Sequence, residues 1–152
     1  MAFNEETVIN QIAAQERAIA GIKNSYAYAT NPDTLPSQEL PAVIHFSPTF
    51  SCDLRANFNV WKNDIGLRSV LFVSPRADSG GKLKYVENAA IPFGQKWRDR
   101  FQDGTVINSL MTNIVGVKIF LAGGDYGAGG NLLTFGGTEY IGWVFKWTIV
   151  SA

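Results

Sequence analysis

The chain has 152 residues, the length of one ordinary domain, of which 46% are hydrophobic and 17% are charged. The charged share lies below the roughly 25% of an average protein, which indicates either an uncharged polar surface or a surface covered by a partner. Thirteen Lys and Arg balance thirteen Asp and Glu, so the chain lacks the basic excess typical of nucleic-acid-binding proteins. Cys52 is the only cysteine, which excludes an internal disulfide and a cysteine zinc site.

The N-terminal sequence MAFNEETVIN carries acidic residues where a signal peptide needs basic ones. No apolar run approaches the length of a membrane span. We therefore expect a protein that folds in a reducing cytoplasm and makes no membrane contact.

The first predicted element is an amphipathic helix over residues 5–22, with Asn4 as its N-cap. Helical spacing places these apolar residues on one stripe: Val8, Ile9, Ile12, Ala13, Ile19 and Ile22. The polar residues Gln11, Gln15, Glu16 and Arg17 are expected mostly on the opposite side. Three prolines then predict an irregular connection over residues 23–41.

A strand is predicted over residues 42–46, and Pro48 places it at a sheet edge or at a strand end. Residues 56–74 read as two strands or as one long bent strand, with a turn or bulge between Asn63 and Gly66. Residues 75–82 are predicted to form a loop. Apolar residues at helical spacing predict a second helix within residues 83–102: Val86, Ala90, Phe93, Trp97 and Phe101. Pro92 should kink this helix or begin its second half.

The part from residue 106 to 150 is predicted to be β-rich, because it contains many β-branched residues. Its last segment, residues 138–150, alternates strictly and predicts a strand with one deeply buried face. That face carries Ile141, Trp143, Phe145, Trp147 and Ile149, and we expect its aromatic row to pack against the N-terminal helix. The predicted class is α+β, a mainly antiparallel sheet with two helices on one face, in a single domain.

Between these β segments lies a glycine-rich stretch, which we predict to be a flexible loop and a candidate assembly contact. Its residues are Gly123, Gly124, Asp125, Tyr126, Gly127, Gly129 and Gly130. A phosphate-binding loop would require a following Lys and Ser or Thr, and these are missing. A long hairpin turn without function is the alternative interpretation of this stretch.

No catalytic, cofactor or metal site is predicted. His45 is the only histidine and lies in an apolar run, so a structural role for it is favoured over a pair with Cys52. The carboxylates that could serve a glycosidase are scattered along the chain: Asp53, Asp64, Asp78, Asp99, Asp103, Asp125 and Glu139. Trp61 could lie on either face of its strand, where it could stack on a ligand.

In order along the chain, several short patterns resemble the tail terminator proteins, also called tail-completion or head–tail joining proteins, of long-tailed bacteriophages. They are Gly21-Ile22-Lys23, Tyr26-Ala27-Tyr28, Leu40-Pro41-Ala42-Val43-Ile44, Val73-Ser74-Pro75-Arg76, Ile91-Pro92-Phe93, and the stretch from Gly137 to Phe145. The glycine-rich stretch is not part of this family pattern.

The resemblance implies a virion structural protein without enzymatic activity or cofactor. Its subunits would form a ring, expected to be a hexamer, at the neck end of the phage tail. The ring would cap the tail tube, stop tube polymerisation and join the head-proximal connector, while DNA passes through it without sequence-specific binding. The alternatives are another phage neck or connector protein of similar fold, a monomeric ligand-binding domain using Trp61 and the glycine-rich stretch, or a small hydrolase.

Overall fold

The computed structural model describes residues 5–26, 32, 35–55, 60–76, 83–106, 117–128 and 133–151. Its helices are α1 (Glu5–Arg17), α2 (Leu83–Ala90) and α3 (Pro92–Phe101), with a 3-10 turn at Ser37–Glu39. Its strands are β1 (Asn24–Ser25), β2 (Ala42–Arg55), β3 (Val60–Pro75), β4 (Val117–Ala128), β5 (Thr134–Phe135) and β6 (Thr138–Ser151).

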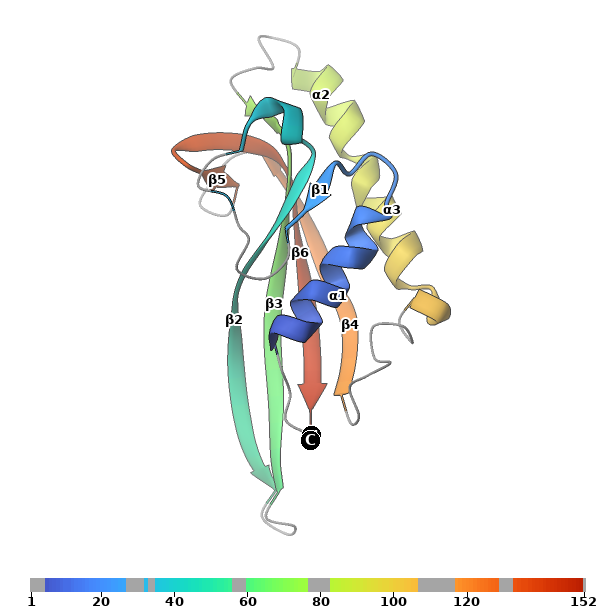
Figure 1. Ribbon diagram of the computed structural model, residues 1–152, viewed down its shortest axis with the longest axis vertical. Helices are drawn as coiled ribbons and strands as arrows, with labels where there is room; N and C mark the ends of the chain where they lie inside the picture. The colour runs from blue at the N-terminus through green and yellow to red at the C-terminus, as the bar shows by residue number, and fades with distance from the viewer. Residues whose placement is uncertain are drawn as a thin grey trace.

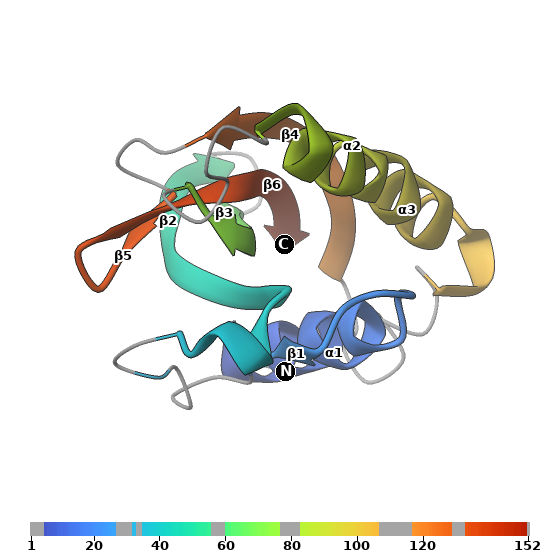
Figure 2. The same cartoon turned by 90° about the horizontal axis from the view of Figure 1, so that it is seen from above.

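The strands form one curved sheet in the order β1-β2-β3-β6-β4, with β5 paired to β6 (Figures 1 and 2). All neighbours pair antiparallel except the short β1, which runs parallel to β2. The helices α1 and α3 pack over the same face, which we call the helix-covered face. The other face is called the outer face. The predicted α+β class and mainly antiparallel sheet are therefore confirmed.

The main core lies on the helix-covered face, where aromatic rings of β6 meet those of α3. Phe145 stacks on Trp97 with ring centroids 4.3 Å apart, and Trp147 meets Phe101 edge-to-face at 4.6 Å. Residues of the α1 stripe, including Ile12, belong to the same cluster. Burial of Phe145 and Trp147 is confirmed, although α3 rather than α1 provides their ring contacts.

A second core, which the alternation of β6 did not predict, occupies part of the outer face. Its residues are Leu35, Leu40, Ala42, Ile44, Val70, Phe72, Leu133, Tyr140 and Val144. The segment around the 3-10 turn and the β5 turn contribute Leu35, Leu40 and Leu133. One end of the sheet is therefore covered on both faces, whereas the long β2–β3 hairpin extends beyond the helices (Figure 1).

Two glycines allow the backbones to approach closely. A Cβ on Gly94 would lie 2.5 Å from Cη2 of Trp143, so only glycine lets α3 sit this close to β6. A Cβ on Gly142 would lie 1.8 Å from the carbonyl oxygen of Leu71. The Trp143 indole also donates a hydrogen bond of 2.9 Å to the carbonyl of Ala90, which fixes the end of α2 on the sheet.

Several element boundaries differ from the predictions. The first helix ends at Arg17, and the chain turns before Gly21, whose φ is +95°. The second helix is divided at Ile91, and Pro92 begins its second half, α3, which is one of the two outcomes predicted for this proline.

In the sheet, β2 continues past Pro48 with only a register shift between Phe46 and Thr49. No strand of the described residues pairs with the outer edge of β2 at Pro48, so the missing N–H group of proline is tolerated there, as the predicted edge position allowed. The predicted turn or bulge at residues 63–66 is wrong, since these residues pair regularly on both sides.

Candidate assembly surfaces

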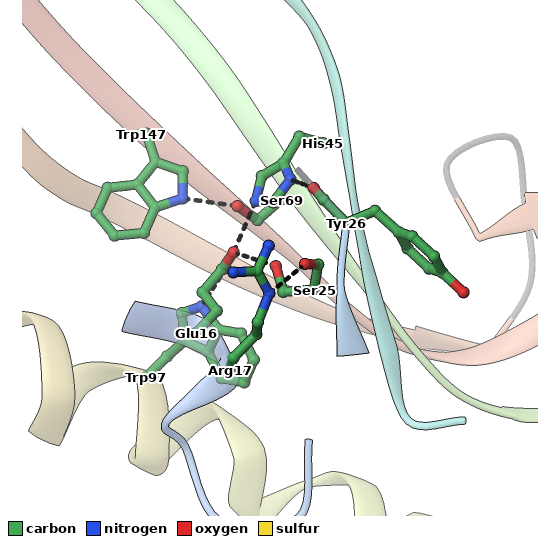
Figure 3. A network of polar contacts seen from close by, with 8 residues as sticks. All are labelled: Glu16, Arg17, Ser25, Tyr26, His45, Ser69, Trp97 and Trp147. Atoms are coloured by element: carbon green, nitrogen blue, oxygen red, sulfur yellow. Dashed lines mark hydrogen bonds and ion pairs between the residues drawn. The ribbon is translucent and has the colours of Figure 1, made fainter. Parts of the chain in front are cut away.

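A buried side chain, Glu16 of α1, connects four elements through hydrogen bonds on the helix-covered face of the sheet (Figure 3). Its Oε1 lies 2.6 Å from Nε2 of His45 on β2 and accepts a 3.1 Å hydrogen bond from the Ser25 hydroxyl on β1. Its Oε2 accepts a 3.1 Å hydrogen bond from the Trp97 indole on α3. Glu16 is 0% exposed. The network therefore holds α1, β1, β2 and α3 in one arrangement.

Both ring nitrogens of His45 are engaged. Nδ1 lies 2.9 Å from the carbonyl oxygen of Tyr26, which can only accept, so Nδ1 carries a proton. A second proton lies between Nε2 and Oε1 of Glu16. Wherever that proton rests, the pair has no net charge, which removes the large cost of burying an unpaired ion.

The structural role predicted for His45 is therefore supported by its contacts. Cys52 is exposed and lies seven residues farther along β2, a span of roughly 23 Å in an extended strand. The two side chains cannot form a nucleophile–base pair, which would require hydrogen-bond distance. The hydrolase hypothesis loses its only histidine.

The predicted position of Glu16 on the polar side of the helix is wrong. Glu16 follows Ile12 by four residues and precedes Ile19 by three, so helical spacing places it within the apolar stripe. A lone histidine in an apolar strand also needs a buried partner. These two signals together could have identified the pair.

The remaining carboxylates form no common site. Asp125 pairs with Lys146 at 2.9 Å, and Glu139 pairs with Arg76 at 3.4 Å, both on the surface. Asp78 and the side chain of Asp53 lie outside the described residues, as does the side chain of Trp61. Within the described ranges, no group of three or more His, Cys, Asp and Glu side chains is placed to hold a metal ion.

The predicted glycine-rich loop is mostly strand. Residues 123–127 belong to β4 and pair antiparallel with residues 142–146 of β6, after a register shift between Leu121 and Gly123. The physical reason is that β6 offers a complete ladder of hydrogen-bonding partners, which outweighs the low strand propensity of glycine. Gly129 and Gly130 lie outside the described residues.

The glycines nonetheless border a groove of about 580 Å³ between α3 and β4. Gln95, Arg98 and Gln102 contribute to its α3 wall, residues 121–124 form the β4 wall, and Trp143 and Phe145 contribute aromatic surface. A Cβ on Gly124 would lie 2.9 Å from Cδ1 of Phe145, so this glycine leaves room for the stacked rings. Two of the predicted contact residues, Gly123 and Gly124, are thus brought beside α3, a neighbour that the sequence had not indicated.

Tyr126, at the end of the same strand, packs edge-to-face on Trp143 with ring centroids 5.7 Å apart. Burial, and then the nearby Glu87 carboxylate, raise the pKa of its phenol from 10.0 to about 12. The phenol oxygen is buried without a hydrogen bond of acceptable geometry, so Glu87 acts mainly through its charge. Tyr126, one of the predicted assembly-contact residues, therefore packs within the fold.

Among the residues whose exposure is described, three large apolar side chains are exposed, and they mark candidate contact surfaces. Phe50 on the β2–β3 hairpin is 71% exposed, Ile91 beside the groove is 49% exposed, and Phe120 on β4 is 44% exposed. Phe50 and Phe120 lie on strands whose outer edges have no paired strand there among the described residues.

The sequence matches no protein-family model, and no curated protein resembles it significantly. Among the described helices, none is long and apolar enough to cross a membrane.

Proposed function

We propose that this chain is a non-enzymatic assembly protein, the tail terminator of a long-tailed bacteriophage. In this proposal copies of the chain form a ring, expected to be a hexamer, that caps the tail tube and stops its polymerisation. The ring also joins the head-proximal connector and lets DNA pass without reading its sequence. The protein would act in the virion, after assembly in the cytoplasm of the bacterial host.

The observation that carries the proposal is the β2–β3 hairpin, which extends past the helices and presents Phe50 to solvent. An exposed aromatic side chain on an unpaired strand edge favours self-association or attachment to another protein. The low charged share and the order of the family-like patterns support the same class of protein. A neighbouring neck or connector protein of similar fold is the alternative within this class.

The genetic test is removal of the coding sequence from the phage that carries it. We expect electron micrographs to show heads separated from tails, with tail tubes of uncontrolled length. Supplying the protein from a plasmid should restore joined particles with tails of one length. Normal particles in its absence would exclude the tail terminator function.

A second candidate is a monomeric ligand-binding domain, favoured by the groove beside Gly123, whose volume is typical of small-molecule sites. Solution mass separates the two candidates. A multiple of the 16.6 kDa chain mass supports assembly, and a strict monomer that gains thermal stability from a small molecule supports ligand binding.

A further inference from the structure

Among the described residues, no strand pairs with either outer edge of the main sheet beyond the short β1. β4 forms one edge, and β2 forms the other beyond Val43, where its pairing with β1 ends. Unpaired N–H and C=O groups on such edges can bind another extended strand. Because β2, β3, β6 and β4 alternate in direction, β2 and β4 run in opposite directions. A second copy, rotated about an axis along the strands, would bring its β2 antiparallel to β4.

Three neighbouring cross-strand rows connect these two edges. The rows are Ser51-Asp64-Val150-Lys118, Thr49-Gly66-Thr148-Phe120 and Phe50-Ile65-Ile149-Ile119. The first two lie on the outer face, and the third lies on the helix-covered face, where its three isoleucines belong to the core. Pairing of two copies would continue each row from the β4 edge of one copy to the β2 edge of the other.

In the row of Phe120, an exposed ring at the β4 edge matches a hollow beside the β2 edge. Phe120 is 44% exposed at the β4 edge, while the β2 edge has a hollow of about 300 Å³ around Gly66 and Thr49. The hollow exists because Gly66 has no side chain between its neighbours. The Phe120 ring of a second copy, on a strand next to β2, would lie beside Thr49 and extend over it into this hollow.

The other two rows add charge and apolar contacts. Lys118 is exposed at the β4 edge, while Asp64 lies one strand in from the β2 edge in the same row. Lys118 of a second copy would lie two strands from Asp64, and its long side chain would extend over Ser51 toward that carboxylate. Phe50, 71% exposed, extends the row of buried isoleucines and would lie beside Ile119 of the other copy.

We propose that two copies of this chain associate through their sheet edges, with β4 of one subunit pairing antiparallel with β2 of the next. One register satisfies all three rows, with Lys118 opposite Ser51, Ile119 opposite Phe50, and Phe120 opposite Thr49. The contact is head-to-tail, so each subunit keeps one free edge of each kind, and repetition generates a ring or a filament. The contact adds to the proposed function by naming the surfaces through which copies would associate. Only the closure of the repeated contact into a ring rests on that function.

The register is tested by a disulfide, because it places Cys52 opposite Val117 of the neighbouring copy. The wild-type chain carries a thiol on β2 alone, and the variant Cys52→Ser/Val117→Cys carries one on β4 alone. The two proteins, one of them tagged, are mixed and oxidised. We expect a disulfide dimer of one tagged and one untagged chain as the main covalent product. The control Cys52→Ser/Lys118→Cys moves the thiol to the other face of β4 and should lose this mixed dimer.

Dimers of like chains only would indicate a two-fold contact between identical edges and overturn the proposal, as would the absence of covalent dimers. Light scattering provides a second readout. Phe120→Ser should lower the average mass, whereas Ile91→Ser, which changes a similarly exposed side chain outside the paired segments of β2 and β4, should not. An unchanged mass with Phe120→Ser contradicts the contact.

The two proposals fail separately. A mixed dimer together with normal tails in the deletion phage leaves the contact standing and excludes the function. Defective tails in that phage, without a mixed dimer, leave the function standing and exclude this contact.

Discussion

Glu16 is the buried carboxyl group on which several segments depend, since its two oxygens make hydrogen bonds with His45, Ser25 and Trp97. Removing one partner of a buried pair leaves the other without compensation, which typically costs about 3–5 kcal/mol. We expect Glu16→Gln to lower the free energy of unfolding by that amount in urea titrations. The amide would also turn a donor toward either the histidine or the indole.

The matched control is Glu139→Gln, which removes the exposed pair with Arg76. Both of those side chains are about half exposed, so solvent screening should limit the loss to less than about 1 kcal/mol. Equal, small effects of the two substitutions would contradict the structural role assigned to Glu16.

Tyr126 predicts a specific alkaline effect. Because its pKa in the folded protein is raised from 10.0 to about 12, the unfolded chain releases the phenol proton first as the pH rises. The contribution of the protonated Tyr126 phenol to the free energy of unfolding is fully present below pH 10, and it is lost between pH 10 and about 12. We expect Tyr126→Phe to remove this part of the alkaline loss of stability.

At neutral pH, Tyr126→Phe should cost little or be stabilising, because the buried phenol oxygen has no hydrogen-bond partner to lose. Urea titrations of both proteins at neutral and at alkaline pH give the comparison. A parallel decline of the two proteins with pH would show that another group causes the alkaline loss.

At the scale of elements, the packing of α3 on β6 depends on the missing side chain of Gly94. The ordinary gain from alanine in a helix is about 1 kcal/mol, but the added Cβ would lie 2.5 Å from the Trp143 ring. Overpacking of this kind typically costs about 1–3 kcal/mol, so we expect Gly94→Ala to be destabilising. Gly104→Ala is the control, since nothing lies within 4 Å of its Cβ position. Equal melting temperatures for the two variants would contradict this packing.

Elements with strong periodicity could be predicted from the sequence. The α1 stripe and the Phe93, Trp97 and Phe101 spacing gave the helices, and strict alternation gave β6. The second half of β4, from Gly123, was missed because local glycine content favours a loop, whereas its pairing with β6 depends on residues about twenty positions away. Of the candidate contact residues, Gly123 and Gly124 border a groove, but only the fold brings α3 beside them.

At the scale of the molecule, the two cores lie on opposite faces of the same strands, so they should melt together. Phe72 is fully buried in the outer-face core and contacts Tyr140 with ring centroids 5.0 Å apart. We expect Phe72→Ala to cost about 3–5 kcal/mol and to lower the midpoint of the whole protein. The indoles of Trp97, Trp143 and Trp147 report on the other core.

Their fluorescence should therefore shift together with the far-ultraviolet circular dichroism signal, giving one transition. Two separated transitions would show that the faces unfold independently, and the single-domain description would then fail.

The Glu16 network also has a kinetic consequence. Its carboxylate meets His45 and Trp97 across 29 and 81 positions of the chain, so it is complete only after distant segments have come together. Contacts that form after the folding barrier leave the folding rate unchanged and slow unfolding. In rapid-mixing experiments, Glu16→Gln should accelerate unfolding and hardly change refolding. The buried pair would then lengthen the lifetime of the native state. A subunit of the proposed assembly would therefore stay folded until it meets other copies.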